Sequence, residues 1–542
     1  MKTNIHKILL GLIIILALVL RMYQISSYPA LNADEAAIGY NAYSLIETGK
    51  DEHGNSWPIH FQSFNDYKPG LYFYIALPFV YFNGLNTLSV RLPGVLMGVF
   101  SVLLLYLFIK EYFKDERLAL ISSLMLAISP WHIHFSRGGW EVNAATFLIL
   151  LGLYLFVKGI GKSRMWLVSL SMLSFVASLY TYHSARIIVP LLVFGLFIFF
   201  RKEMRKKAKA IIVILLVGLV LLLPLVKDFT GPAGVSRASG VSIIADKGTI
   251  SQINEQRGEH ISVNGFEAQI FHNKAVNYGF VFANNWLKHY WGEFLFLSGD
   301  DIQRNKVPET GQMYLFDIIF VLAGLYFIAR KPNKWGFIIY WLIVAPIAAA
   351  LTFQSPHALR AHNMVVPLVV ISANGLLGIY DVLKAKKKKY LIYAGTTIIV
   401  LAMVWNFTHY LRMYWLHMAK QYPYSSQYGV EELVGYVNYV EGCYKNIVVT
   451  TRYDQPYILF LFYSQYPPNI FQKEHELTER DEYGFSTVNR FGKYVFQAID
   501  YSEVLSDYPN SLVAGTQEEI LVDGHVIAFP NGDPAFIITE TN

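Results

Sequence analysis

Long uncharged apolar runs, separated by short basic clusters, constrain this chain more than any other feature. Such runs are about as long as the roughly 20 residues that a helix needs to cross a hydrocarbon core of about 30 Å. Only 15% of the 542 residues are charged, against about 25% in soluble globular proteins. The pattern predicts a polytopic α-helical membrane protein. It excludes a disordered chain, a collagen-like chain and a soluble multidomain enzyme.

Eleven apolar runs are candidate transmembrane helices. They lie near residues 8–20, 91–109, 118–130, 142–157, 165–181, 187–200, 210–226, 313–329, 335–353, 364–383 and 390–406. The first run could also be a signal peptide, but no small-x-small cleavage pattern precedes Asn32, so a retained anchor is favoured. Segment 71–84 is apolar and aromatic but short, which is typical of an interfacial helix.

Basic clusters fall between alternate runs, at residues 110–117, 158–164, 201–209, 330–334 and 384–389. Under the positive-inside rule these clusters and the N-terminus are cytoplasmic. For the lysine run 386–389, a topogenic role is favoured over nucleic-acid binding because it stands beside a span. The remaining connections, with loops 21–90 and 227–312 the longest, are then extracytoplasmic.

Residues 407–542 lack a spanning run and are richer in Asp, Glu, Asn and Gln. Apolar residues within 430–440 follow a helical spacing, whereas 446–451 and 535–539 are typical of short strands. We therefore expect two parts: a membrane domain at 1–406 and a small extracytoplasmic α/β domain at 407–542.

The predicted spans carry few ionisable residues, with Asp317 the one plainly internal acid. A proton- or ion-coupled transporter would need charged groups near the midplane. The polar residues gather instead in the external loops, which favours an enzyme that acts at the outer surface on a lipid-embedded substrate.

The first external loop has an acidic pair, Asp34 and Glu35, followed by Tyr67, Lys68 and, at the next span, Arg91. A carboxylate can deprotonate an acceptor hydroxyl, while Lys and Arg neutralise a phosphate leaving group. An acidic pair in a loop is, on its own, more often solvated surface.

Four external segments in order resemble a known family. They are the first loop, with Asp34-Glu35, Tyr43, Gly49, Pro58, Lys68-Pro69 and Arg91-Leu92-Pro93; Ser129-Pro130 to Arg137; Tyr180 to Arg186, which includes Tyr182 and His183; and Pro356-His357 to Arg360 and His362. This series is similar to that of GT-C glycosyltransferases of the protein O-mannosyltransferase and aminoarabinose transferase (ArnT-like) type. Gly70 departs from it, because the family often has Lys-Pro-Pro.

The resemblance implies a GT-C fold and a hexosyl or pentosyl transferase of the cell envelope. Such an enzyme moves a monosaccharide from a polyprenyl-phosphate carrier to a hydroxyl of a protein, lipid or glycan, usually with inversion. Asp34 would be the general base, with Glu35 as the alternative. Donor phosphate binding would fall to Lys68, Arg137, Arg186 and Arg360, for which the alternative is anchoring to lipid headgroups. Further candidates for substrate binding are Tyr67, Arg91, Glu141, Tyr182, His183, His357 and His362.

No cofactor is expected. The external histidines match no zinc spacing, and by resemblance a monophosphate leaving group needs no metal. Cys443, the single cysteine, excludes an intramolecular disulfide. The expected partners are the lipid-linked donor, a hydroxyl acceptor and the bilayer, without nucleic acid.

Two other classes remain as alternatives. A lipid or polysaccharide flippase would need paired charges in the spans. A glycan polymerase or ligase that uses a lipid diphosphate would depend on loop 227–312, which could cap the site, receive the acceptor or hold the lipid tail, or could be an interfacial helix pair.

Overall fold

The computed structural model describes residues 2–64, 66–229, 240–385, 389–479 and 486–541. Packing divides the chain into two compact units. The first comprises Met1–Leu20, Gly98–Phe135 and Val142–Tyr410, and the second comprises Arg21–Met97, Ser136–Glu141 and Leu411–Asn542. The composition predicted two continuous domains with a boundary at 406/407. The two compact units are each made of separate segments, so that domain boundary stays a prediction.

Apart from one isolated β-bridge between Ser242 and Thr352, the first unit has helical regular secondary structure in its described residues. It holds all or most of α1 (Lys2–Met22), α4 (Thr87–Phe113), α5 (Glu116–Ile128), α6 (Pro130–Ser136), α7 (Glu141–Gly161), α8 (Met165–Leu179), α9 (Ala185–Phe199), α10 (Arg201–Arg205), α11 (Ala208–Phe229), α13 (Lys247–Gly258), α14 (Phe266–Phe271), α15 (Lys274–Lys288), α16 (Phe316–Arg330), α17 (Gly336–Val344), α18 (Ile347–Ala350), α19 (Val365–Ala385) and α20 (Lys389–Arg412).

A helix lies at each of the eleven predicted spans. Among the described residues, six helices are long and apolar enough to cross a membrane: α1, α4, α7, α11, α19 and α20. The pair α5 and α6, bent by 59°, would make a seventh. The prediction of a polytopic helical membrane protein is confirmed, whereas the count of eleven stays a prediction because α8, α9, α16 and α17 are short.

Helices α16 and α19 pack closely because glycines face backbone at their crossing. A Cβ on Gly375 would lie 1.8 Å from the carbonyl oxygen of Phe320, and one on Gly324 would lie 2.1 Å from that of Ile371. Small residues of this kind let two membrane helices approach each other. The glycines therefore fix how these two helices pack.

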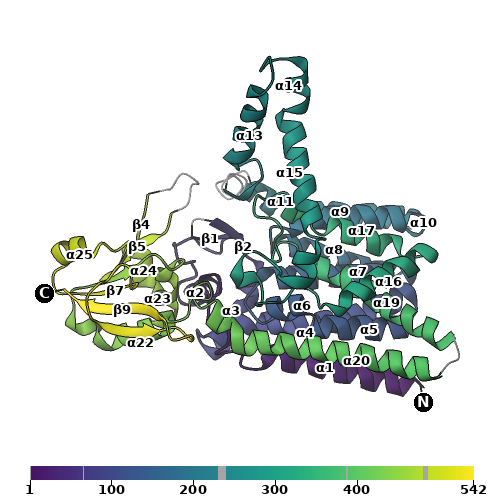
Figure 1. The fold of residues 1–542 in the computed structure, drawn as a ribbon, viewed down its shortest axis with the longest axis horizontal. Coiled ribbons are helices and arrows are strands. Elements are labelled where there is room, and N and C mark those ends of the chain that lie inside the picture. The colour runs from purple at the N-terminus through teal and green to yellow at the C-terminus, as the bar shows by residue number, and fades with distance from the viewer. Residues whose placement is uncertain (1, 65, 230–239, 386–388, 480–485, 542) are drawn as a thin grey trace. The chain divides into compact units, whose positions relative to one another are not determined.

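Part of loop 227–312 forms a helical hairpin rather than an irregular loop. Helices α13 and α15 lie side by side, joined through the short α14, and they run across the long axes of α9 and α17 instead of along them (Figure 1).

The second unit begins with α2 (Ala33–Thr48), the antiparallel strands β1 (His60–Ser63) and β2 (Asp66–Pro69), and α3 (Leu71–Asn83). The predicted helix at 71–84 is therefore present. Residues 33–48, expected as loop, are helical.

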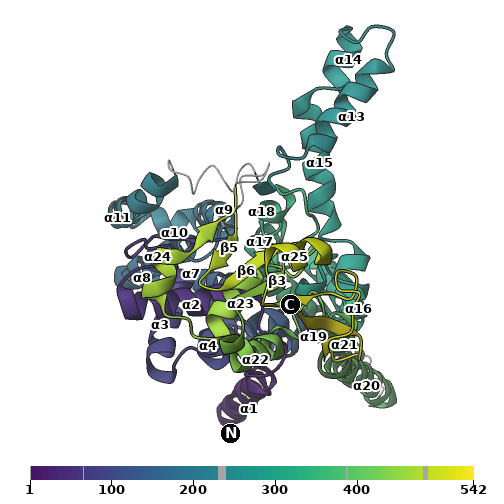
Figure 2. The ribbon, with the colours of Figure 1, turned by 90° about the vertical axis from the view of Figure 1, so that its left-hand side faces the viewer.

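The C-terminal part of the second unit contains a seven-stranded mixed sheet in the order β4-β5-β6-β3-β7-β9-β8. The central strand β3 runs parallel to both β6 and β7, and the other pairings are antiparallel. Figure 2 shows β3 and β6 side by side, with α22 and α23 nearby. The strands are β3 (Asn446–Thr450), β4 (Glu476–Leu477), β5 (Val488–Phe491), β6 (Tyr494–Gln497), β7 (Ser511–Gly515), β8 (His525–Ala528) and β9 (Pro534–Glu540).

The central strands β3 and β7 are buried at consecutive positions, with Val448 and Val513 fully inside. The accompanying helices are α21 (Met418–Gln421), α22 (Val430–Val440), α23 (Pro456–Tyr463), α24 (Pro468–Glu474) and α25 (Tyr501–Asp507). The predicted helix near 430–440 and the two predicted strands are confirmed. The other strands of this sheet were not predicted; β4, β5, β6 and β8 have four residues or fewer, and β7 has five.

Candidate functional site

The acidic pair lies in the first turn of α2. Asn32 caps this helix: its side-chain oxygen accepts from the backbone N–H of Glu35 at 3.0 Å, and the Glu35 carboxylate accepts in return from the backbone N–H of Asn32 at 3.3 Å. Gly49, at φ 70°, ends the helix in the left-handed conformation. The sequence contains the pattern for this reciprocal capping, with Glu35 three residues after Asn32 and Gly49 at the end of the helix.

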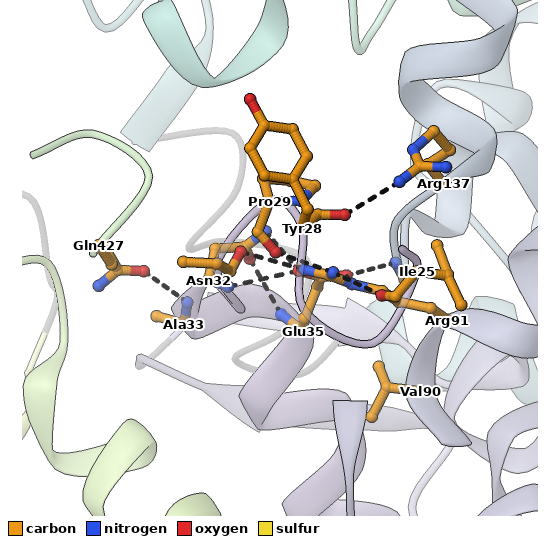
Figure 3. Close-up of polar contacts among 12 residues, drawn as sticks. Ile25, Tyr28, Pro29, Asn32, Ala33, Glu35, Val90, Arg91, Arg137 and Gln427 are labelled. Atoms are coloured by element: carbon orange, nitrogen blue, oxygen red, sulfur yellow. Dashed lines mark hydrogen bonds and ion pairs between the residues drawn. The ribbon is translucent and has the colours of Figure 1, made fainter. Parts of the chain in front are cut away.

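Glu35 is held in a buried ion pair with Arg91. Its two carboxylate oxygens accept from Nε and Nη2 of Arg91, both at 2.7 Å, and Oε1 also accepts from the backbone N–H of Gly139 at 2.8 Å. The Arg91 guanidinium donates further to three backbone carbonyls, those of Ile25, Pro29 and Ala30. Figure 3 shows this cluster. Both side chains are buried, so the pair anchors α2 to the start of α4.

Asp34, one residue earlier, pairs with Lys68 instead. Lys68 Nζ lies 2.5 Å from Asp34 Oδ1, and the two side chains are 13% and 22% exposed. Lys68 lies on β2, opposite Phe61 of β1, and its ammonium group is 4.8 Å from the Phe64 ring centroid. The structure thus gives the two adjacent acids different surroundings, with Asp34 the one that solvent reaches.

Arg137 lies in a buried cage of carbonyl and aromatic groups. It donates to the carbonyl oxygens of Arg21 and Tyr28 at 3.1 and 3.0 Å, and to the Tyr414 hydroxyl at 3.1 Å. Its guanidinium carbon is 4.7 Å from the Trp415 ring centroid. Arg137 is 1% exposed, so in this structure its guanidinium faces protein.

Tyr67 and Glu141 also belong to the second unit. Tyr67 is partly exposed on β2, opposite Gln62, and Glu141 begins α7 and is buried.

The other predicted site residues belong to the first unit, where Tyr182, His183 and Arg186 form a local group. The rings of Tyr182 and His183 lie 6.4 Å apart, and Arg186 Nη1 is 3.0 Å from His183 Nδ1. Arg186 Nε donates to the carbonyl oxygen of Leu179, so this arginine closes the turn before α9.

The segment with His357 and Arg360 is held by Asp300, a residue that the sequence analysis did not single out. Asp300 Oδ2 accepts from the backbone N–H of Ala358 at 2.6 Å and lies 3.6 Å from His357 Nδ1. Burial raises the pKa of the Asp300 carboxyl. Arg360 donates to the Thr352 hydroxyl at 2.7 Å. The acidic pair Asp300-Asp301 was a signal that could have been followed.

His362 lies in the interior of the first unit. Its Nδ1 is 3.1 Å from the Thr146 hydroxyl, and its ring stacks on His132 at 5.6 Å. Within the described parts of the chain, no three His, Cys, Asp or Glu side chains are placed to hold a metal ion. The expectation that no metal is required stays a prediction.

The second unit contains another buried ionisable cluster, which the sequence analysis missed. Its members are Glu52, His53 and His475. His475 Nδ1 faces the Phe471 carbonyl oxygen at 2.9 Å, so it donates there; His53 Nδ1 is 3.3 Å from His475 Nε2, and His53 Nε2 is 3.8 Å from Glu52 Oε1. Burial raises the pKa of Glu52 to about 8 and lowers that of His53 to about 3. Both groups are therefore neutral near pH 7.

Comparison with solved structures indicates the fold class of the chain. Over 97% of both chains, the structure is similar to ArnT from Cupriavidus metallidurans bound to undecaprenyl phosphate, with a TM-score of 0.53 and 10% identity. It is also similar to the archaeal oligosaccharyltransferase AglB from Archaeoglobus fulgidus, with a TM-score of 0.53 and 14% identity over 85% of this chain and 64% of that one. The chain therefore has the fold of GT-C membrane glycosyltransferases, and the predicted resemblance is confirmed.

A family model also matches part of the chain. Residues 67–227 match the family described as dolichyl-phosphate-mannose-protein mannosyltransferase. The curated relatives include "Putative mannosyltransferase YycA" of Bacillus subtilis, 29% identical over 157 residues, and an uncharacterized protein of Aquifex aeolicus, 26% identical over 180 residues. These matches cover 28% and 33% of this chain, and they span only 23% and 35% of the relatives' lengths.

Proposed function

We propose that this chain is a GT-C glycosyltransferase. It moves a monosaccharide, a hexose or a pentose, from a polyprenyl-phosphate carrier to an acceptor hydroxyl at the extracytoplasmic face. The observation that carries the proposal is the Asp34–Lys68 pair, in which a partly exposed carboxylate on α2 lies 2.5 Å from an ammonium group on β2, while the adjacent acid Glu35 is engaged by Arg91. The ArnT structure contains undecaprenyl phosphate and the AglB structure contains a dolichol-phosphate, which supports a carrier of this kind.

In this reaction Asp34 is the general base. It takes the proton of the acceptor hydroxyl while that oxygen attacks the anomeric carbon. The bond from the anomeric carbon to the phosphate oxygen breaks, and polyprenyl phosphate leaves with its electron pair. Attack from the side opposite the leaving group inverts the anomeric carbon.

Glu35 is a positioning residue in this proposal. Its carboxylate already accepts two hydrogen bonds from Arg91 and one from Gly139, so proton abstraction would cost the buried Arg91 its counter-charge. The ion pair instead fixes the first turn of α2, and with it the direction of Asp34. Arg91 shares this role, which differs from the substrate binding expected from its position.

Lys68 orients Asp34 in the resting state and neutralises charge as the phosphate departs. Arg186 and Arg360, both partly exposed, are the guanidinium groups proposed to bind the carrier phosphate. Tyr182, His183, His357 and His362 support these two arginine segments. Arg137, with its donors directed into protein, holds the segment before α7 in place.

The proposal includes the topology. Eleven spans place the N-terminus in the cytoplasm and residues 407–542 outside, because every basic cluster then faces the cytoplasm.

The test uses purified protein in nanodiscs with radiolabelled polyprenyl-phosphate sugars and crude membranes as the source of acceptor. We expect wild type to consume one donor, and Asp34→Asn to be about 10²- to 10⁴-fold slower because the general base is lost. The matched control is Asp523→Asn, at an exposed loop position of the C-terminal part, which should leave the rate unchanged. An Asp34→Asn rate equal to wild type would remove Asp34 from the mechanism. If wild type consumed no donor, the transferase assignment would fail, and a flippase or a diphosphate-dependent polymerase would be tested next.

A further inference from the structure

The α13–α15 hairpin presents an apolar face that no described residue covers. Along α15, the residues Val276, Phe280, Ala283 and Leu287 recur at helical spacing on one side. Phe280 is 70% exposed and Leu287 is 50% exposed. In water, such a stripe would be unfavourable for a surface helix.

The side of α15 next to the stripe, toward α13, is polar. Lys274, Asn277, Asn284 and Lys288 lie there at the same helical spacing, and α15 contains no acidic residue. Helix α13, which packs along α15, is rich in Gln, Asn and charged residues. The hairpin is therefore two-layered, with an apolar α15 face on one side and a hydrophilic α13 on the other.

The base of the apolar face continues onto the bundle. Trp286 Nε1 donates to the carbonyl oxygen of Ile343 at 2.9 Å, and the Tyr290 hydroxyl donates to that of Leu342 at 2.9 Å. Both acceptors are on α17, an apolar helix whose Ile343 side chain is 45% exposed. The α15 stripe thus extends a surface that faces lipid in a membrane-embedded bundle.

The direction of the hairpin also fits a position at the membrane surface. The helices of the bundle run parallel to one another, as membrane crossing requires, and α13 and α15 run across them, with α15 on the side nearer the bundle (Figure 1). Helices at this angle lie in the plane of the membrane surface. The α15 stripe then faces the bilayer and α13 faces water.

Apolar side chains are also exposed at the end of the hairpin. Around α14, Ile261, Phe266 and Phe271 are each more than 60% exposed. Exposed aromatic and aliphatic residues, with lysines on the adjoining polar face, are typical of helices at a membrane interface.

We propose that the α13–α15 hairpin lies flat on the bilayer surface at its end of the bundle, with the α15 stripe and the α14 end inserted at the level between headgroups and acyl chains. The partner is the membrane that holds the bundle, rather than another protein. This surface is independent of the proposed transferase activity.

Site-specific fluorescence tests this placement in the full chain. In a Cys443→Ser background, single cysteines are introduced as Phe280→Cys and Leu287→Cys on the stripe. The control is Ser251→Cys, at an exposed position of α13 outside the cavity that Phe280 lines with Gln252 and Gln256. Each variant is labelled with an environment-sensitive fluorophore and reconstituted into phosphatidylcholine vesicles. We expect lipids with nitroxide-labelled acyl chains to quench the two stripe positions about twofold or more above the control, and aqueous iodide to quench the control more strongly.

Equal iodide quenching at all three positions would place the stripe in water and overturn the proposal. Protection of the stripe from both quenchers would place a protein there and overturn it as well. A label-free second measurement uses Trp286→Phe/Trp291→Phe, which should lower the fraction of tryptophan fluorescence that brominated lipids quench. The melting temperature of each variant, compared with its parent, shows whether the fold is kept.

Discussion

Glu35 and Arg91 form a double hydrogen bond, Nε to Oε1 and Nη2 to Oε2, each of 2.7 Å and closed to solvent. The two residues are 56 positions apart in the sequence. Their pairing ties the first turn of α2 to the start of α4, and it leaves Asp34 as the acid at the accessible edge.

Glu35→Gln is expected to destabilise the protein. The change leaves the Arg91 charge buried without its counter-charge, and breaking one side of a buried pair costs about 3–5 kcal/mol. Thermal unfolding in detergent, followed by loss of monodisperse protein, measures the effect. Asp34→Asn, changed one residue away in a partly exposed pair, serves as the comparison and should lower the melting temperature much less. Equal losses for the two variants would contradict the division of roles.

Lys68→Met is expected to slow donor consumption by about 10²-fold, because it removes the cation beside Asp34 and beside the departing phosphate. Lys68→Arg keeps the charge but changes its shape, so part of the activity should return. The rate of donor consumption at saturating polyprenyl-phosphate sugar is measured for both variants and for wild type. If methionine and arginine gave the same rate as wild type, the ammonium group would have no role in the reaction.

The contribution of Glu52 to the free energy of unfolding should fall as pH rises from about 4.5 to about 8. Burial raises the pKa of Glu52 from 4.5 to about 8, so the folded chain binds a proton that the unfolded chain has released. Its contribution is fully present below pH 4.5 and is lost progressively up to about pH 8. Each unit of pKa difference corresponds to about 1.4 kcal/mol.

Glu52→Gln keeps the neutral shape at every pH. Melting temperatures from about pH 5 to pH 9 should show the variant gaining on wild type as pH rises. Glu476→Gln, at an exposed position on β4, should run parallel to wild type. A constant difference between Glu52→Gln and wild type across this range would exclude the proposed linkage.

Gly375→Ala is expected to destabilise the α16–α19 crossing. The new Cβ would meet the Phe320 carbonyl oxygen at 1.8 Å, so one helix must move, at a cost of about 1–3 kcal/mol. Gly435→Ala in α22 has open space and should instead stabilise by about 0.5–1 kcal/mol. Thermal unfolding of the two variants tests the crossing, and opposite signs are the expected result.

Cys443 allows a direct test of topology, because it is the single cysteine and is exposed. In intact cells, a membrane-impermeant maleimide should label it, since the proposal places residues 407–542 outside. In a Cys443→Ser background, Lys162→Cys at a predicted cytoplasmic cluster should react only after permeabilisation. The reverse pattern would invert the proposed orientation.

The sequence predicted the parts of the fold that depend on local physics. Apolar runs marked all six helices of the described residues that are long and apolar enough to cross a membrane, because lipid requires a helix wherever about 20 apolar residues occur together. The strand at 446–450 could be predicted because Ile447, Val448 and Val449 are β-branched. In the structure all three are buried.

The sequence did not predict which charged side chains form ion pairs. Asp34 and Glu35 are adjacent carboxylates, and which one meets Arg91 depends on the rotation of a helix that was read as loop. The sequence analysis missed Asp300 because its contacts with His357 and Ala358 join segments that are 58 positions apart in the chain. Long-range partners of this kind need the tertiary structure.

The adjacency of the two acids on α2 has a consequence for tolerated variation. Successive helical residues point about 100° apart, so one side chain faces inward only while the other faces outward. One residue inserted between Asn32 and Glu35 would carry the Glu35 side chain about 100° further around the helix and break the reciprocal cap with Asn32. The three-residue spacing from Asn32 to Glu35 should therefore tolerate no insertion or deletion.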